Sequence, residues 1–264
     1  MRYALLATEG YHDQAAIGRL LTLAGLKNFD GTHEELDNFW KKFIPTYPAR
    51  RQKIYYRLPV PSIYQSGELS VAVYQGEGSN LIENITTELK NHLPFRRDID
   101  AFGIIVDADR ESPHTIARQF AQALRQFFPT FSEIPGEITH GTPRTGLYVL
   151  PDNVHEGTLD TLLIRCADVV YADLKQEAET YLAQVDTTYK RRWKPFDEHK
   201  ALIATIVSVL KPGATNTASI AQNKWIGEQS IAGIGEVAAL SRFLYDLLEI
   251  GGLRGSRNDN RVSS

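Results

Sequence analysis

The sequence lacks several features that would place it in a specialised class of protein. Its 264 residues include one cysteine, Cys166, so a framework of disulfides within the chain is excluded and a reducing compartment is favoured. No stretch approaches the roughly 18 consecutive apolar residues that a membrane-spanning helix needs. The first residues lead directly into RYALLAT and show no signal-peptide pattern. We therefore expect a soluble, cytoplasmic protein in which Cys166 is a buried structural thiol.

A strong charge of either sign is also absent. The chain has 29 Lys and Arg against 32 Asp and Glu, a net charge of −3, so a nucleic-acid partner would have to meet a local basic face. There is no P-loop motif, and any ATP-driven activity would need a separate ATPase protein. The hydrophobic content of 42% is ample for one large domain, or for a domain with an appended lobe.

The first half of the chain alternates short apolar runs with segments of helical spacing. The apolar runs are YALLAT at 3–8, the start of ELSVAVYQGEGSN at 68–80, AFGIIVD at 101–107 and TGLYVLP at 145–151. Continuous apolar runs are typical of strands that are covered on both faces, and the intervening segments carry apolar residues at helical periodicity. This order predicts an α/β fold with a mostly parallel, Rossmann-like sheet flanked by helices.

The pattern also predicts how the chain is divided. We expect residues 1–151 to form the α/β domain, with an insert at 27–67 that contains KKFIPTYPARRQKIYYRLPVP. This insert is either a surface excursion with a hairpin or a substrate-facing arm that meets phosphates and bases. Residues 152–250 predict a C-terminal helical lobe packed on the sheet, with helices at 157–166, 168–185, 197–210 and 235–250. The glycine-rich, polar residues 251–264 predict a flexible tail.

Acidic residues follow three of the four predicted strands. Glu9 follows the first strand, Asp107 and Asp109 the third, and Asp152 the fourth. The carboxyl ends of parallel strands meet at one edge of a sheet, where ligands bind in folds of this kind. Like charges so close together favour a counter-ion, and ligands that are all oxygen favour Mg²⁺ or Mn²⁺ over zinc. An acidic loop edge without chemistry is the alternative interpretation.

Two segments resemble the Toprim domain, the metal-dependent catalytic module of topoisomerases, primases and OLD-family nucleases. They are TEGYHD after the first predicted strand and FGIIVDADR at the third, and the resemblance covers roughly residues 1–151. Two further segments, GLYVLPDNVHEGTLDTLL and HKALIATIVSVLKPG, resemble an uncharacterised group of bacterial Toprim-like proteins and extend the likeness to most of the chain. The resemblance implies the Toprim form of the α/β fold.

The resemblance also implies roles for individual residues. Glu9 matches the Toprim glutamate, which is a metal ligand or general acid/base, and Asp107 and Asp109 match the pair that holds Mg²⁺. Asp13 matches an acidic position of OLD-like members, and Lys200 matches a lysine that those nucleases set beside the scissile phosphate. For Asp13 and Lys200, a helix-dipole contact or plain surface charge is the alternative interpretation.

Further residues complete the predicted site. Asp160 stands where the bacterial group usually has glutamate, so a metal ligand at this position would have to reach further. Lys194 is a second candidate for stabilising the leaving oxygen, and His12 and His199 are expected to be neighbours of the site. Substrate contacts are expected from residues at the strand ends, namely Gly10, Gly76, Gly78, Arg110 and Asp152. Helix capping is the alternative for Asp152 and Asp160.

These residues predict a hydrolase, a Mg²⁺- or Mn²⁺-dependent endonuclease in which water attacks a phosphodiester of DNA or RNA. No tyrosine stands out as a topoisomerase nucleophile, and no primase-type zinc module is present. Two other classes stay open: a Mg²⁺-dependent phosphohydrolase of nucleotides or small phosphates, and a non-catalytic nucleic-acid-binding or regulatory protein that keeps a Toprim-like shell. The sequence leaves strandedness, the number of metal ions and the oligomeric state open.

Overall fold

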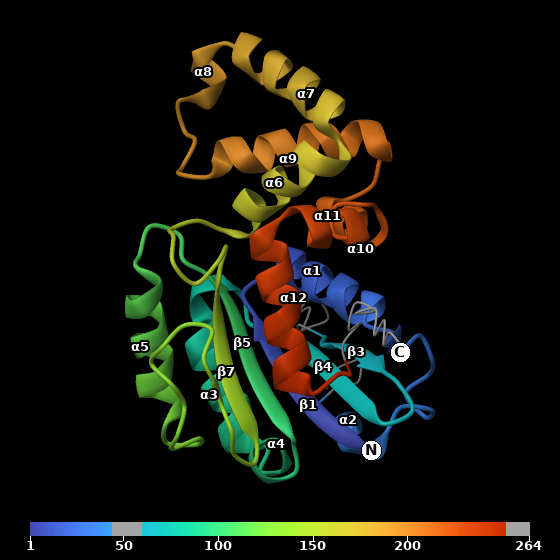
Figure 1. The fold of residues 1–264 in the computed structure, drawn as a ribbon, viewed down its shortest axis with the longest axis vertical. Helices are drawn as coiled ribbons and strands as arrows, with labels where there is room; N and C mark the ends of the chain where they lie inside the picture. Colours follow the sequence, from blue (N-terminus) through green and yellow to red (C-terminus); the bar gives the residue numbers. More distant parts are fainter. Residues whose placement is uncertain (44–59, 252–264) are drawn as a thin grey trace, which may run out of the picture.

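The computed structural model describes residues 1–43 and 60–251. These residues form a seven-stranded sheet and twelve α-helices, which confirms the α/β class (Figure 1). The strands lie in the order β2-β3-β4-β1-β5-β7-β6 across the sheet. Their bounds are Arg2–Thr8 for β1, Lys27–Asn28 for β2, Ser62–Gln65 for β3, Leu69–Gln75 for β4, Ala101–Asp107 for β5, Ile138–Thr139 for β6 and Arg144–Leu150 for β7.

The four central strands, β4, β1, β5 and β7, are parallel and are the four that the apolar runs predict. Leu5 of β1 lies opposite Ala72 of β4 and Phe102 of β5, which fixes the register across the centre of the sheet. Each of these strands has seven residues, and nearly all of them are buried. Both faces of the sheet are therefore covered, which is why the strands appear in the sequence as continuous apolar runs.

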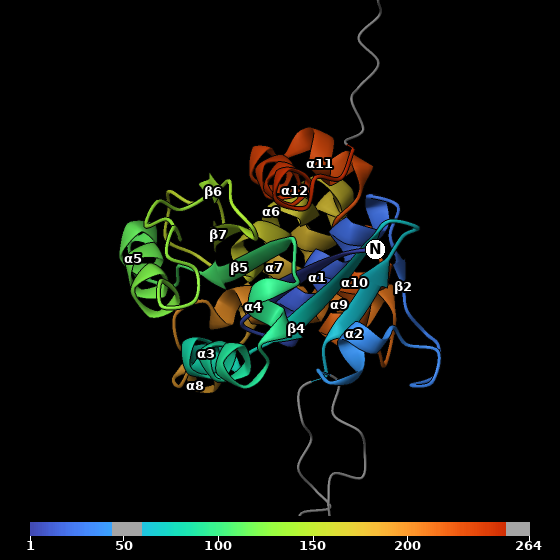
Figure 2. The same ribbon diagram turned by 90° about the horizontal axis from the view of Figure 1, so that it is seen from below.

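Helices cover the two faces of the sheet (Figure 2). Alternate residues of β1 serve different cores: Ala4 and Leu6 face the side of α1 and α12, whereas Leu5 and Ala7 face the side of α2, α3 and α5. The helices within residues 1–151 are α1 (Tyr11–Leu23), α2 (Asn38–Lys41), α3 (Leu81–Asn91), α4 (Pro94–Arg97) and α5 (Pro113–Leu124), with a short 3₁₀ helix η1 at Gly78–Asn80.

The insert at 27–67 differs from a simple surface excursion. Its described parts add β2 and β3 to the sheet as antiparallel strands, and α2 places Trp40 in the core, where its Nε1 donates to Ser70 Oγ at 2.8 Å. The antiparallel pairing of β3 with β4 agrees with the expected hairpin. The sequence does not predict β2 or the buried Trp40, because a strand of two residues and a single helical turn carry no periodicity. Residues 44–59, with most of the cations and tyrosines of the insert, lie outside the described residues, as does the predicted tail beyond Gly251.

From Pro151 to Gly251 the regular elements are all helices. They are α6 (Leu159–Val170), α7 (Ala172–Gln184), α8 (Thr187–Lys190), α9 (Asp197–Leu210), α10 (Asn216–Gln222), α11 (Glu228–Gly233) and α12 (Gly235–Leu248). Helices α6 to α9 lie beyond the carboxyl ends of the strands, while α12 returns to pack against β5 and β7 (Figure 1). Cys166 in α6 is fully buried, as expected. Within the described ranges, no helix is long and apolar enough to span a membrane.

Candidate metal centre

The acidic residues after β1 and β5 meet at one edge of the sheet. Glu9 directly follows β1, Asp107 is the last residue of β5, and Asp109 lies two residues further on. Because β1 and β5 are parallel neighbours, with Thr8 opposite Ile105, the turns that follow them lie side by side. This is the carboxyl edge, where the sequence places the site.

The loop before α6 is tied to the turn that carries Asp107 and Asp109. Asp109 has a left-handed backbone, with φ of 50°, and exchanges two hydrogen bonds with Gly157: its N–H donates at 2.8 Å and its carbonyl accepts at 2.9 Å. Asp107 Oδ1 accepts the N–H of Leu159, the first residue of α6, at 2.8 Å. These contacts fix the N-terminus of α6, and with it Asp160, at the acidic edge.

Asp13 joins the same edge from the first turn of α1. Its Oδ2 accepts the N–H of Gly10 at 2.8 Å, and the side chain is buried. The carboxylates of Asp13 and Asp107 thus each use one oxygen on a backbone N–H. In both cases the second oxygen is left for another ligand.

Burial and mutual repulsion raise the pKa of three of these carboxyl groups. The pKa of Glu9 rises from 4.5 to about 7, first because of burial and then because of Asp13 and Asp109, against a smaller opposing effect of the Asp107 backbone. The pKa of Asp13 rises to about 7, mainly through burial, although the N–H of Gly10 opposes the shift. Burial, Asp13 and Glu9 raise the pKa of Asp107 well above its usual range.

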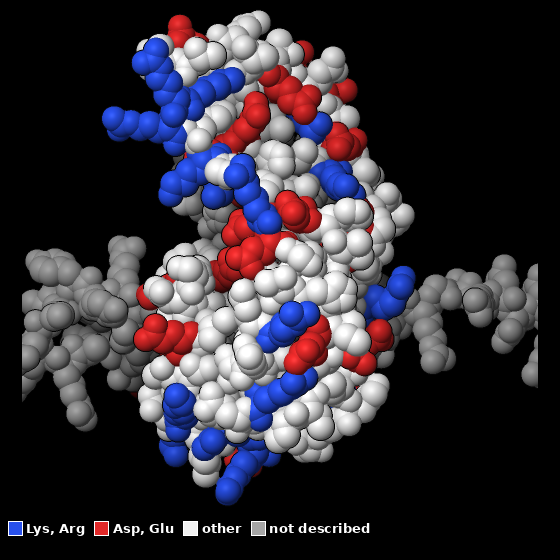
Figure 3. All heavy atoms as spheres, turned by 90° about the vertical axis from the view of Figure 1, so that its left-hand side faces the viewer, with Lys and Arg blue, Asp and Glu red and all other residues white. Residues whose placement is uncertain are grey.

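Asp160 and Lys200 also reach this edge, as expected. Burial raises the pKa of Asp160, while His12, Lys200 and His199 oppose that rise. His199 Nδ1 of α9 lies 3.4 Å from Thr161 Oγ1 of α6, and Lys200 Nζ is 3.9 Å from Asp197. Acidic side chains gather where the sheet meets the helical lobe, and Lys and Arg side chains gather on the lobe above them (Figure 3). The carboxyl edge of the sheet is therefore acidic, and the part of the helical lobe that borders it, which includes Lys200, is basic.

The donor chemistry of these groups suits Mg²⁺ or Mn²⁺. Glu9, Asp13, Asp107 and Asp109 supply only carboxylate oxygens. A divalent cation would offset the repulsion that helps to raise the pKa values of Glu9 and Asp107. As the side chains stand in the described part of the chain, no three His, Cys, Asp or Glu residues are spaced to hold a metal. A cation would have to draw the carboxyl groups closer together.

The residues predicted to contact substrate have different surroundings. Gly78, at φ of 66°, donates its N–H to the carbonyl of Glu9 at 2.8 Å, and a Cβ on Gly76 would lie 2.2 Å from Leu81 Cδ1. The turn after β4 is therefore packed against Glu9. Arg110 is exposed beside Asp109. Asp152 instead accepts the N–H groups of Val154 and His155 and contacts His155 Nδ1 at 2.7 Å, which explains it as a turn residue.

Gln75 is a residue of this edge that the sequence did not single out. It ends β4 opposite Thr8, and its Nε2 donates to the carbonyl of Glu9 at 3.0 Å. This contact fixes the amide orientation and leaves Oε1 buried without a partner among the described residues. Its position in the sequence is the signal that could have found it. Gln75 is the first polar side chain after the apolar run of β4, just as Thr8 is the first after the apolar run of β1.

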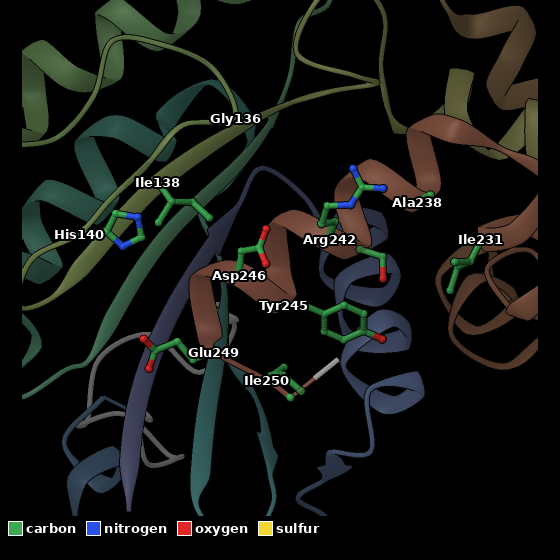
Figure 4. A pocket seen from close by; sticks show the side chains of 12 residues that line it. Gly136, Ile138, His140, Ile231, Ala238, Arg242, Tyr245, Asp246, Glu249 and Ile250 are labelled. Atoms are coloured by element: carbon green, nitrogen blue, oxygen red, sulfur yellow. The ribbon is translucent and has the colours of Figure 1, made fainter. Parts of the chain in front are cut away.

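One hollow of the described surface lies away from this edge. It has a volume of about 1150 Å³ and lies between α12 and the β6 edge, with Arg242, Tyr245 and Asp246 of α12 and His140 around it (Figure 4). Glu249 at its rim is engaged by Arg144 and Arg2, at 2.6 and 3.5 Å, and so serves the fold. Size alone does not mark a site, and we place the candidate centre at the carboxyl edge, where buried carboxyl groups converge.

The fold and the edge together define a mixed α/β protein in which the half-buried Glu9 and Asp107, at the carboxyl ends of central strands, lie beside the buried Asp13 and Asp160. A family model described as "Protein of unknown function (DUF3226)" matches residues 3–247, and the chain belongs to that family. The crystal structure of a hypothetical protein from Pyrococcus horikoshii OT3 is similar in fold, with a TM-score of 0.51 and 16% identity over 96% of this chain and 100% of the other. No curated protein matches the chain. Neither description states an activity, so the Toprim resemblance stays a prediction.

Proposed function

We propose that the chain is a divalent-metal-dependent nuclease of the Toprim type, which hydrolyses phosphodiester bonds in DNA or RNA. The observation that carries this proposal is the meeting of Glu9, Asp13 and Asp107 at one edge, with pKa values raised first by burial and then by neighbouring carboxyl groups. Such an arrangement destabilises a protein without a cation, and perturbed carboxyl groups of this kind are typical of functional sites. The resemblance of TEGYHD and FGIIVDADR supports the same proposal.

Each residue has a role that follows from its position. Asp107 and Asp109, with Glu9 and Asp13, would hold Mg²⁺ or Mn²⁺, which when bound supplies charge to offset that of the transition state. Glu9, at the end of β1 beside Asp107, is suited to orient the attacking water or to accept its proton. Lys200 would stabilise the leaving oxygen.

In this proposal Asp160 positions Lys200. It lies close enough to His12, Lys200 and His199 for all three to favour its charged form. The shorter Asp160 side chain, in place of the glutamate usual in the resembling group, then serves to hold Lys200 at the edge. The sequence has no P-loop, so any ATP-driven step in this proposal belongs to a separate ATPase partner.

The proposal is tested by incubating the purified protein with linear, nicked and supercoiled DNA and with RNA, in Mg²⁺, Mn²⁺ or EDTA. We expect metal-dependent cleavage that Asp107→Asn lowers by orders of magnitude and that Asp98→Asn leaves unchanged. Asp98 is an exposed carboxylate that precedes β5, at the opposite edge of the sheet. Hydrolysis of nucleotides or small phosphates without nuclease activity would overturn the proposal and show that the protein is a phosphohydrolase. A protein that binds neither metal in calorimetry would favour a non-catalytic role.

A further inference from the structure

A positively charged segment lies on the helical lobe beside the acidic edge. It comprises residues 189–194, YKRRWK, at the end of α8 and in the connection to α9; we call it the basic segment. Arg191, Arg192 and Lys194 are exposed and form no ion pair with any residue in the described ranges. Lys and Arg side chains cluster on this side of the lobe (Figure 3). Their charge is thus available to an anionic partner.

The backbone of the basic segment is held in place. Trp193 is partly buried against the core of the lobe, its N–H donates to the carbonyl of Lys190 at 2.9 Å, and Lys190 Nζ lies 5.4 Å from its ring centroid. The N–H of Lys194 donates to Asp197 Oδ2 at 2.6 Å. Tyr189, in contrast, is 78% exposed, which is unusual for a large aromatic side chain. The segment therefore presents free cations and one free aromatic ring on a fixed backbone.

The basic segment leads directly to the candidate metal centre. Helix α9 begins three residues after it, at Asp197, and the first turn of α9 carries His199 and Lys200. His199 contacts Thr161 of α6, and Lys200 favours the charged form of Asp160. Exposed cations therefore lie both on the outer surface of the lobe and, at Lys200, beside Asp160 of the acidic edge.

We propose that the basic segment binds the backbone of a single-stranded nucleic acid and leads it to the acidic edge. Arg191, Arg192 and Lys194 bind successive phosphates, and the exposed ring of Tyr189 stacks on a base. Only an unpaired strand offers a base for such stacking, because a double helix keeps its bases inside. This inference rests on the proposed function for the identity of the polymer, but binding is measured without cleavage.

The test is fluorescence anisotropy in EDTA with labelled oligothymidylate of about 20 nucleotides and with a duplex of equal length. The combined Arg191→Ala, Arg192→Ala and Lys194→Ala variant is expected to bind at least tenfold more weakly. Its salt slope should fall by about 2, since each phosphate contact on a single strand contributes roughly 0.7. Tyr189→Ala should weaken binding about tenfold, and Tyr189→Phe should restore it, because stacking needs the ring and not the hydroxyl.

A matched control variant instead removes three cations from residues 1–151, away from the basic segment. Lys27, Lys90 and Arg97 are exposed, and replacing all three by alanine changes the net charge by the same amount. This control is expected to bind like the unmodified protein. Equal losses in both triple variants would show that overall charge binds the strand and would overturn the inference. So would duplex binding as tight as single-strand binding, or an unmodified protein that binds neither.

The two proposals fail in distinguishable ways. If the basic-segment variants lose binding in EDTA but the unmodified protein cleaves nothing with any metal, the nuclease proposal fails and the binding inference stands. If metal-dependent cleavage of single strands is the same in the basic-segment variant and the unmodified protein, the binding inference fails and the nuclease proposal stands.

Discussion

Asp107 is the residue that links the two halves of the proposed site. It ends the central strand β5, and its Oδ1 accepts the N–H of the first residue of α6. One oxygen thus serves the fold, while burial and the charges of Asp13 and Glu9 disfavour ionisation of the group. A residue with both roles can be tested by a substitution that keeps the first and removes the second.

Asp107→Asn is such a substitution. Its amide oxygen can still accept the N–H of Leu159, but the charge that would hold a cation is lost. We expect cleavage to fall by orders of magnitude, with partial recovery in excess Mn²⁺, while stability in EDTA changes by less than about 1 kcal/mol or rises. Cleavage rates and thermal unfolding in EDTA measure the two effects. If the variant unfolds at a much lower temperature than the unmodified protein, or cleaves equally fast, Asp107 has only a structural role.

The raised pKa values of Glu9 and Asp13 predict how stability depends on pH. Both carboxyl groups are easier to protonate in the folded chain, with pKa values of about 7, than in the unfolded chain. Their stabilising contribution is therefore complete below about pH 4 and is lost as the pH rises through 7, at about 1.4 kcal/mol per pKa unit for each group. We expect metal-free protein to be less stable at about pH 8 than at about pH 5.5, and Mg²⁺ to restore stability at the higher pH.

Denaturant unfolding at both pH values, with and without Mg²⁺, tests this dependence. The control is the double variant Glu9→Gln with Asp13→Asn, in which the contribution of these two groups is absent. If the unmodified protein and the double variant show the same change in stability with pH, the two carboxyl groups are not perturbed as described.

At the scale of elements, the site depends on the loop that joins β7 to α6. The paired hydrogen bonds between Asp109 and Gly157 hold this loop against the end of β5. Gly157 has φ of 144°, and a Cβ there would lie 3.2 Å from Pro151 Cδ and from Thr161 Oγ1. A side chain at this position would displace the start of α6, and with it Asp160.

Gly157→Ala is therefore expected to destabilise the protein by about 1–3 kcal/mol and to lower nuclease activity more than tenfold. The matched control is Gly213→Ala, which also has a left-handed backbone, at φ of 80°, but open space around it and a position between α9 and α10. The control should lose stability alone. Unfolding free energies and cleavage rates of both variants check this prediction. Equal nuclease activity in the two variants would show that the loop before α6 does not position the site.

The sequence predicted the elements with strong periodicity and missed the others. The four central strands and α9, at Asp197–Leu210, agree with the predicted ranges because apolar runs and helical spacing are long there. The sequence does not predict the short α8, α10 and α11, since helices of this length depend on tertiary contacts. In α10, for example, Ser219 Oγ accepts a hydrogen bond from Trp225 Nε1. In the site, the strand-end rule placed Glu9 beside Asp107. The position of Asp160 depends on the Asp109–Gly157 contact, which has no local signal.

At the scale of the molecule, the sheet and the helical lobe share one hydrophobic core. Leu6 and Tyr148 of the sheet belong to the same buried cluster as Leu163 and Ile203 of the lobe. Helix α12 covers β5 and β7, with Leu244 in that cluster. Residues 1–151 therefore lack part of their own core.

We expect residues 1–151 alone not to fold, although the sequence pattern marks them as a domain. Without α12 the face of β5 and β7 would be exposed, and burial of large apolar side chains contributes about 1.5–3 kcal/mol each. Residues 1–251 should unfold in one cooperative transition. Circular dichroism and thermal unfolding of both fragments measure this. A cooperative transition in the 1–151 fragment would show that the α/β part is an independent domain.

The position of α12 has a consequence for synthesis of the protein. Arg2 of the first strand donates to the carbonyl of Leu248, and Arg144 of β7 donates to the carbonyl of Leu247, so strands made early are completed by a helix made late. When the strands of the sheet have left the ribosome, α12, which covers one face of the sheet, has not yet been synthesised. Until then the nascent chain exposes the apolar face that α12 covers, and translation that stops before α12 is expected to yield a polypeptide that is prone to aggregation and degradation.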